Sequence, residues 1–386
     1  MIRHLFLTFC ILALSVAAGA QSAETITIGT TQSLTGPFQD FGTEQLRGLQ
    51  MWVDDVNGRG MLLGQRVELV HYDDASDAAR SVQFYGKLIE QDKVDLLVGP
   101  YSSDITLEAS KVAEQHNFPM VASAASADEI WSRGLKNIFG VDTPSSNYMD
   151  VDENGALFKL MGVKTMAVVF AETAFAQDVV RGIRGYASRK GVRIVLDEGY
   201  AADQKEFSGL ASRLKQANAD VIFGISYLDD SVALVRALKQ ANVKPKMLAF
   251  TVGPALSEFG ELLGADAEGV VGVVQWLRSV RMPGAQDFAY RYRQRYGNNP
   301  GVHAVIGYSA GQVLEAAVRL AGTTDHDAVR EQLRTMQFRS LLGKYHVSET
   351  GRQEGKRNYL LQWQQGHRRL VAPKNLAERE LIFPLP

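Results

Sequence analysis

Two segments of the chain combine serine hydroxyls with the expected start of a helix. In Gly99–Ser103 a short buried strand ends and a helix over Ser103–His116 is expected to begin. In Ala122–Glu129 the same change follows the next expected strand. The N-terminus of a helix offers unpaired N–H groups and a partial positive charge, and serine hydroxyls add donors. Because open α/β sheets bind ligands at the carboxyl ends of their strands, both segments are predicted anion-capture sites.

Helix capping is the alternative explanation for Ser126. Ser126 and Glu129 have the spacing of a capping box, in which serine and glutamate satisfy free N–H groups at the start of a helix. One serine can serve both purposes, since capping also holds the amides that face a ligand.

The residue types needed for catalysis or metal binding are present but are not grouped. None of the seven histidines has a second ligand at metal spacing, and no Gly-x-Ser-x-Gly nucleophile motif occurs. The glycines of Asn57–Gly64 follow an expected helix and precede a strand, which reverses the order that phosphate binding requires. No pair of carboxylates is set apart as acid and base. The sequence therefore predicts no metal, no cofactor and no enzymatic activity.

Strand and helix patterns alternate along the chain in two series, which predicts parallel sheets covered by helices on both faces. The expected strands of the first series are Thr25–Thr30, Arg66–Tyr72, Asp95–Val98 and Pro119–Ser123, and those of the second are Thr165–Phe170, Val192–Leu196, Asp220–Phe223 and Lys246–Phe250. Val141–Ser146 contains Pro144 and is expected to link the two series. Two series of this kind predict two lobes.

Composition supports an ordinary globular protein. The 386 residues are 46% hydrophobic and 22% charged, and a chain of this length is expected to form two domains. The formal net charge of −2 gives no electrostatic reason to expect a nucleic acid partner.

The first residues have the pattern of a secretory signal. Basic Arg3 and His4 precede the apolar run Leu5–Ala18, and Ala18–Ala20 matches a cleavage site, so residues 1–23 are a predicted signal peptide. The rival interpretation is a retained membrane anchor. Cys10, the only cysteine, lies inside the signal, so we expect a periplasmic protein without a lipoprotein anchor and without disulfides.

The chain resembles the periplasmic branched-chain amino acid-binding proteins of ABC transporters, the leucine/isoleucine/valine-binding group. The resemblance rests on Gln32–Pro37, Val70–Asp74, Gly99–Ser103 and Trp131–Gly134, and it extends from about Ile26 to Trp363. It implies a type I periplasmic binding fold, with two doubly wound parallel-sheet lobes joined by three crossover strands. Lobe one would comprise residues 24–143 and 274–357, and lobe two residues 144–273 and 358–386.

The resemblance also implies a function and a set of site residues. A monomeric receptor would close on a small ligand between its lobes and deliver it to a membrane permease. By position, Ser103, Ala124 and Ser126 match the family's carboxylate-holding residues. Tyr227 matches a tyrosine that reaches across from lobe two.

Departures from the family pattern leave the ligand open. Phe41 and Phe175 stand where the family often has tyrosine, which predicts a more apolar pocket. Thr251 aligns with the acidic residue that holds the ammonium in the family's amino acid binders. An ammonium buried without a charge partner costs several kcal/mol. Asp229 or Asp230 could supply the negative charge, or could simply cap the helix that follows. Alternatively, the ligand could have no α-amino group and be an aromatic or aliphatic carboxylate or an amide.

Two other functional classes are alternatives to a transport receptor. The same module could sense a ligand for a kinase or chemoreceptor, in which case its partner would be a signalling protein. A secreted enzyme is the third class, and recovery of the ligand chemically unchanged would exclude it.

Overall fold

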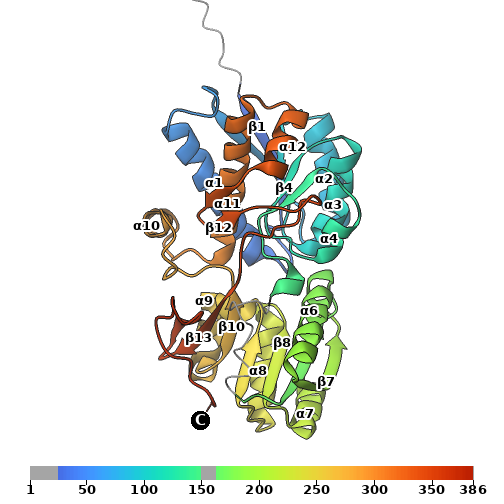
Figure 1. Cartoon of the computed structure of the whole chain (residues 1–386), viewed down its shortest axis with the longest axis vertical. Coiled ribbons are helices and arrows are strands. Elements are labelled where there is room, and N and C mark those ends of the chain that lie inside the picture. Colours follow the sequence, from blue (N-terminus) through green and yellow to red (C-terminus); the bar gives the residue numbers. More distant parts are fainter. Residues whose placement is uncertain (1–24, 149–161, 386) are drawn as a thin grey trace, which may run out of the picture.

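The computed structural model describes residues 25–148 and 162–385. These residues form two α/β lobes, one above the other in Figure 1. The prediction of two lobes built on largely parallel sheets is confirmed. The predicted signal peptide, with Cys10, lies outside the described residues.

The upper lobe is built on a five-stranded parallel sheet with the order β2-β1-β3-β4-β5. Its strands are β1 (Ile26–Gln32), β2 (Val67–Asp73), β3 (Leu96–Val98), β4 (Met120–Ala122) and β5 (Ile138–Gly140). Neighbouring residues of β3 face opposite cores: Leu96 joins the cluster that contains α1 (Gln39–Gly58) and α11 (Val302–Ala321), and Leu97 joins that of α2 (Ala78–Glu90) and α3 (Ser103–Gln115). Helices therefore cover both faces, as the apolar strand sequences require.

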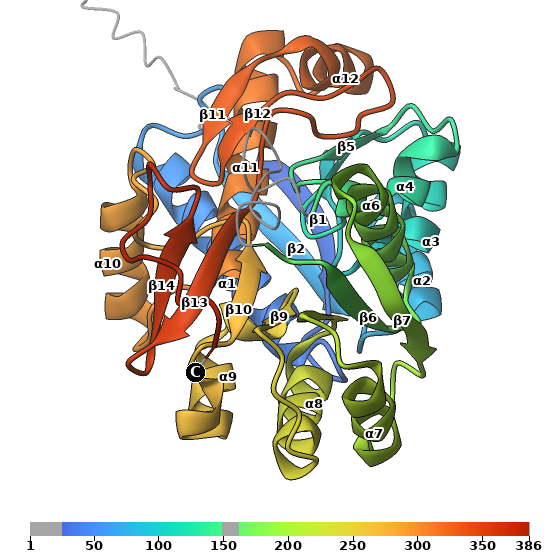
Figure 2. The same ribbon diagram turned by 60° about the horizontal axis from the view of Figure 1, so that its bottom comes forward.

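The lower lobe contains a seven-stranded sheet with the order β14-β13-β10-β9-β8-β6-β7. Its strands are β6 (Thr165–Ala171), β7 (Arg193–Tyr200), β8 (Val221–Ile225), β9 (Met247–Phe250), β10 (Val271–Val274), β13 (Tyr359–Gln364) and β14 (His367–Ala372). Helix α6 (Ala174–Lys190) packs on one face, and α7 (Ser208–Ala217), α8 (Leu228–Gln240) and α9 (Ser257–Leu263) pack on the other. Strands β13 and β14 run antiparallel beside β10, so the predicted parallel sheet ends in an antiparallel hairpin (Figure 2).

The described chain passes between the lobes after β5, after β10 and after β12 (Gly343–Tyr345). The second passage leads to α10 (Ala285–Tyr296), α11, α12 (His326–Thr335) and β11 (Phe338–Ser340), all in the upper lobe. The resemblance implied that strands would cross between the lobes. The crossing segments instead lie outside regular strands, and they comprise Val141–Thr143, Gln275 and the residues just before β13. The exact lobe boundaries stay predictions.

Helices α1 and α11 are joined so closely that their backbones touch. A Cβ at Gly48 would lie 1.9 Å from the Ala304 carbonyl oxygen, and one at Gly307 would lie 2.1 Å from the Gln45 carbonyl oxygen. Only glycine permits this approach. Since α11 is held against α1, the first turn of α11 is fixed in place between the lobes.

Asp220 ties together the starts of three strands in the lower lobe. Its Oδ2 accepts the N–H groups of Lys164 (2.8 Å) and Thr165 (3.0 Å), and its Oδ1 lies 2.8 Å from Lys246 Nζ. Burial alone would raise the pKa of Asp220, but these hydrogen bonds and the Lys246 charge lower it to about 2.

We expect this carboxylate to stabilise the fold only above acidic pH. The folded pKa is below the unfolded value, so the contribution is fully present above about pH 4 and is lost as pH falls towards about 2. Asp220→Asn should lower the free energy of unfolding at neutral pH, and the difference from wild type should shrink on acidification. Urea unfolding at stepped pH measures this, and a difference that did not change with pH would contradict it.

Candidate functional site

A cavity of about 530 Å³, counting the open solvent at its mouth, lies between the two lobes. The upper lobe and the first passage line it with Tyr101, Ser102, Ser103, Ala124, Ser126, Asp142, Tyr148, Val302, His303 and Ile306. The lower lobe and the second passage line it with Phe175, Tyr227, Val252, Ala255, Val273, Val274 and Gln275. The cavity thus lies at the carboxyl ends of strands from both sheets, where ligands of open α/β sheets bind.

The two predicted anion-capture segments meet in this cavity. Ser103, the first residue of α3, accepts the N–H groups of Ser126 and Ala127 on its Oγ, each at 3.1 Å. The hydroxyl hydrogen of Ser103 is left to donate to a third group. Ser126 Oγ lies 3.0 Å from Ser145 Oγ. Serine hydroxyls from two loops therefore converge at one end of the cavity.

The capping alternative for Ser126 is wrong. Helix α4 (Asp128–Ser132) begins after Ala127, and no side chain accepts a hydrogen bond from its first turn as a cap. The Glu129 N–H instead donates to Asp178 Oδ2 of α6 at 3.3 Å. Ser126 therefore lies before the helix, where it lines the cavity and its hydroxyl contacts that of Ser145.

Three other predicted residues also line the cavity. Ala124 is on the upper wall, and Phe175 and Tyr227 reach it from the lower lobe. The Phe175 ring lies 5.2 Å from that of Tyr148 and 6.2 Å from that of Tyr227, measured between centroids. Tyr101, Tyr148 and Tyr227 all carry hydroxyls, so the wall is aromatic but not purely apolar.

Three predicted residues lie away from the wall. Phe41 stacks on Tyr101 at 5.1 Å, one layer behind the cavity. Thr251 is buried and its hydroxyl is fully engaged with the Ser226 backbone, accepting from N–H (3.0 Å) and donating to the carbonyl (2.9 Å). The exposed carboxylate of Asp229 lies in a separate outer pocket, 3.8 Å from Lys205 Nζ.

Asp230, the other candidate charge partner, is also directed elsewhere. It is buried and accepts the Tyr200 hydroxyl at 2.8 Å. Burial raises its pKa, and the Tyr200 hydrogen bond opposes that rise. Asp230 is therefore part of the lower-lobe core around Tyr200.

Sequence reasoning missed Tyr101, Asp142, Tyr148, Gln275 and His303. Asp142 falls in Val141–Ser146, the segment that was expected only to link the lobes, and Tyr148 follows that segment. A usable signal existed for Asp142, because the buried run Ile138–Gly140 is a short strand and Asp142 follows its carboxyl end. Gln275 gave the same signal, because it follows the carboxyl end of the buried strand β10, whereas His303 lies in a helix and gave none.

Three polar atoms of the cavity wall are buried without a hydrogen-bond partner among the described residues. They are Ser102 Oγ, Asp142 Oδ1 and His303 Nδ1. Burial lowers the pKa of His303 to about 3, so its imidazole is neutral at physiological pH. Burial raises the pKa of Asp142 to about 7, although the Lys356 charge and the Gln275 side chain oppose this. Among the described residues of the cavity wall, Asp142 is the one acidic group.

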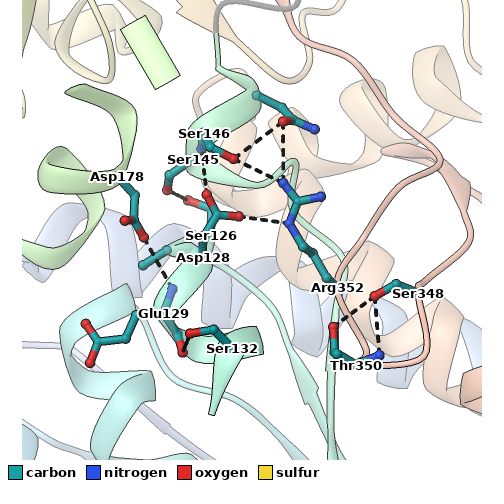
Figure 3. Close-up of polar contacts among 12 residues, drawn as sticks. Ser126, Asp128, Glu129, Ser132, Ser145, Ser146, Asp178, Ser348, Thr350 and Arg352 are labelled. Carbon is teal, nitrogen blue, oxygen red and sulfur yellow. Dashed lines mark hydrogen bonds and ion pairs between the residues drawn. The ribbon is translucent and has the colours of Figure 1, made fainter. Parts of the chain in front are cut away.

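A polar network holds the first and third passages together beside the site (Figure 3). Arg352 Nε donates to Asp128 Oδ1 at 2.8 Å, and its Nη2 donates to Ser146 Oγ at 3.1 Å. Asp128 Oδ2 accepts the Ser146 N–H at 3.1 Å. The Ser126–Ser145 pair lies next to this network, so its hydrogen bonds hold the loops that carry these serines in place.

The lobes are in contact across the mouth of the cavity. The Ala174 N–H at the start of α6 donates to Asp104 Oδ1 of α3 at 3.0 Å. On the other side, the Phe38 and Tyr227 rings lie 5.6 Å apart. The structure is therefore a closed arrangement, in which a ligand would touch both lobes.

Searches for metal-binding and membrane-spanning features found none in the described residues. Over 25–148 and 162–385, no three side chains of histidine, cysteine, aspartate or glutamate are grouped as a metal site. Over the same ranges, no helix has the length and apolar character needed to cross a membrane.

Known proteins of the same architecture cover nearly the whole chain. A homologue of Leu/Ile/Val-binding proteins from Brucella melitensis is 26% identical, over 97% of this chain and 99% of its own. A branched-chain amino acid transporter substrate-binding protein from Streptococcus pneumoniae, solved with isoleucine, superposes with a TM-score of 0.82 at 21% identity, over 94% of this chain and 100% of its own. An ABC transporter solute-binding protein from R. palustris, solved with benzoate, superposes with a TM-score of 0.78 at 21% identity, over 90% and 96%.

The family model described as periplasmic binding protein matches residues 25–368. That range includes both sheets up to the start of β14 and every residue of the cavity wall. A family of binding proteins also agrees with the prediction that the chain is not an enzyme. The two-lobed chain belongs to the periplasmic binding protein family.

Proposed function

We propose that the protein is the extracytoplasmic solute receptor of an ABC transporter, which binds a small carboxylate-bearing ligand between its lobes. The observation that carries this proposal is the convergence of Ser103 and Ser126 at one end of the interlobe cavity. The hydroxyl hydrogen of Ser103 has no assigned acceptor among the described residues, and hydrogen bonds hold the loop of Ser126 in place. Both features favour the binding of an anionic group there. The ligand would close the lobes because it contacts both of them.

Branched-chain or related amino acids are the first candidate ligands. The Brucella homologue is named for leucine, isoleucine and valine, and the Streptococcus structure holds isoleucine. Carboxylates without an amine are the second candidate, because the R. palustris protein of the same fold holds benzoate. The aromatic wall formed by Tyr148, Phe175 and Tyr227 suits either an aliphatic or an aromatic side group.

The remaining parts of the proposal concern location and partners. The signal-like residues 1–23 support export to the periplasm, and the position of Cys10 before the cleavage site supports a form without a lipid anchor. The proposed partner is a membrane permease that receives the ligand from a monomeric receptor. A sensing role would instead be revealed by a signalling protein as the partner.

The proposal is tested with the mature chain, screened for thermal stabilisation by L-amino acids, short amides, and aromatic and aliphatic carboxylates. A ligand at ~100 times its Kd should stabilise the fold by ~2.7 kcal/mol, which raises Tm visibly. Small-angle scattering should then show a smaller radius of gyration on ligand addition, and the ligand should be recovered unchanged. If no carboxylate raised Tm, the receptor function proposed for this cavity would be wrong.

A further inference from the structure

A buried carboxylate, Asp142, stands in the cavity wall with an oxygen that accepts no hydrogen bond. Asp142 is only 6% exposed, and its Oδ1 has no donor. An unsatisfied buried acceptor is costly, and more so when it belongs to an ionisable group. Such a group persists where a bound ligand supplies the missing donor.

The backbone places Asp142 beside the residues proposed to hold the carboxylate. Strands β4 and β5 run parallel with Ala122 opposite Gly140, so Ala124 and Asp142 lie equally far beyond the two strand ends. The loops stay together after that point, because the Ser145 N–H donates to the Ser126 carbonyl at 2.7 Å. Asp142 therefore lies at the same end of the cavity as Ser126.

Asp142 is surrounded by side chains from the other two passages, Gln275 and Lys356, which both act on its carboxylate, but no described residue donates to its Oδ1. Gln275 Oε1 accepts the Thr143 N–H (2.9 Å) and Lys356 Nζ (3.3 Å). Lys356 thus donates to Gln275, and among the ion pairs of the described residues none joins Lys356 to Asp142. Burial raises the pKa of Asp142 to about 7 and lowers that of Lys356 to about 7, and the charge of each group opposes the shift of the other.

The other acidic groups considered for a ligand amine are unsuited to this task. Position 251 is a threonine whose hydroxyl is engaged with Ser226. Asp229 is at the surface, and Asp230 is bonded to Tyr200. Among the described residues of the cavity wall, Asp142 alone combines a carboxyl group with a free acceptor atom.

We propose that Asp142 accepts a hydrogen bond from an ammonium on the ligand carbon next to the carboxylate, so that the ligand is an α-amino acid recognised by a charge of the upper lobe. This inference rests on the proposed function, since it needs the carboxylate at Ser103 and Ser126. The β4–β5 pairing brings the loop of Asp142 beside the loop of Ser126, so we expect the amine and the carboxylate of the ligand to be close together. Gln275 and Lys356 hold the Asp142 side chain in position, so less conformational entropy is lost when the ligand binds.

The test compares ligands that differ only in the amine. Calorimetry or thermal titration would measure L-leucine against 4-methylpentanoate, and L-phenylalanine against 3-phenylpropanoate, on the wild-type chain and on Asp142→Asn. The wild type should prefer the amino form of the pair it binds by about 10- to 100-fold, the value of one charge-assisted hydrogen bond. Asp142→Asn should remove that preference and leave the affinity for the form without the amine within about threefold.

Asp229→Asn is the matched control, because it makes the same change outside the cavity and should retain the wild-type preference. A wild-type chain that bound both forms of a pair equally would overturn the role of Asp142 and leave the receptor function intact. The same conclusion would follow if folded Asp142→Asn kept the preference. If neither form of any pair bound, the carboxylate site itself would be refuted, and the inference with it. The wild-type comparison needs no variant, so it decides the question even if Asp142→Asn does not fold.

Discussion

Replacing Ser103 and Ser126 together by alanine should reduce ligand affinity by roughly 10²- to 10⁴-fold, since each lost charge-assisted hydrogen bond is worth about 1.5–3 kcal/mol. The Ser103 hydroxyl has a second effect. Its Oγ accepts the N–H groups of Ser126 and Ala127, so its removal also frees the loop that presents the anion site. Calorimetric titration with the tightest ligand from the screen measures the loss.

The matched control removes two serine hydroxyls that are close in the fold but outside the cavity. Ser132 donates to the Glu129 carbonyl within α4, and Ser348 lies in the turn near Thr350 (Figure 3). Ser132→Ala with Ser348→Ala should leave affinity near the wild-type value. Unchanged affinity in the Ser103 and Ser126 double variant, with its fold intact, would show that the ligand's carboxylate lies elsewhere.

Trp52→Ala should lower the free energy of unfolding by about 3–5 kcal/mol, the range for a large aromatic side chain removed from a core. Trp52 is fully buried between α1 and α11, where it packs over Gly311 and donates its indole N–H to Glu315 at 3.0 Å. The cavity left behind cannot close, because the glycine contacts already hold the two helix backbones together. Urea unfolding measures the change.

Two further variants separate packing from other effects of Trp52→Ala. Trp52→Phe retains most of the apolar volume and should lose clearly less stability. Tyr290→Ala removes an exposed aromatic ring of α10 and should change stability by less than about 0.5 kcal/mol. Trp52 does not line the cavity, so ligand affinity of the folded protein should stay unchanged. A loss under about 1 kcal/mol for Trp52→Ala would mean that the α1–α11 contact is not central to the core.

The alternation of apolar strands and amphipathic helices determined the two-lobed α/β architecture. This information is local, since burial on both faces requires runs such as Val221–Ile225 to be apolar throughout. The antiparallel pairing of β13 and β14 was not predicted, because pairing direction depends on partners far away in the sequence. The strand β5 was not predicted, because Ile138–Gly140 combines two large apolar residues with a glycine, whereas the equally short β3 and β4 are apolar throughout.

The presence of Ser103 and Ser126 in the cavity wall could be predicted because it depends on local chemistry. Ser103 and Ser126 each follow the carboxyl end of a parallel strand, and the sheet brings such ends together whatever the rest of the chain does. The same reasoning could not exclude capping for Ser126, since a sequence does not show where the first turn of a short helix begins.

Only the tertiary structure decided which carboxylate lines the cavity. Three candidate residues follow strand ends of the lower lobe but do not line the cavity. The Thr251 hydroxyl bonds to the Ser226 backbone, Asp229 is exposed at the surface, and Asp230 accepts the Tyr200 hydroxyl. Asp142 enters the wall because the chain leaves β5 there to cross between the lobes. The sequence by itself determined the two lobes and the serines at their strand ends. The contact between the lobes decided the rest of the cavity, because its residues come from both lobes and from the first and second passages, which are far apart in the sequence.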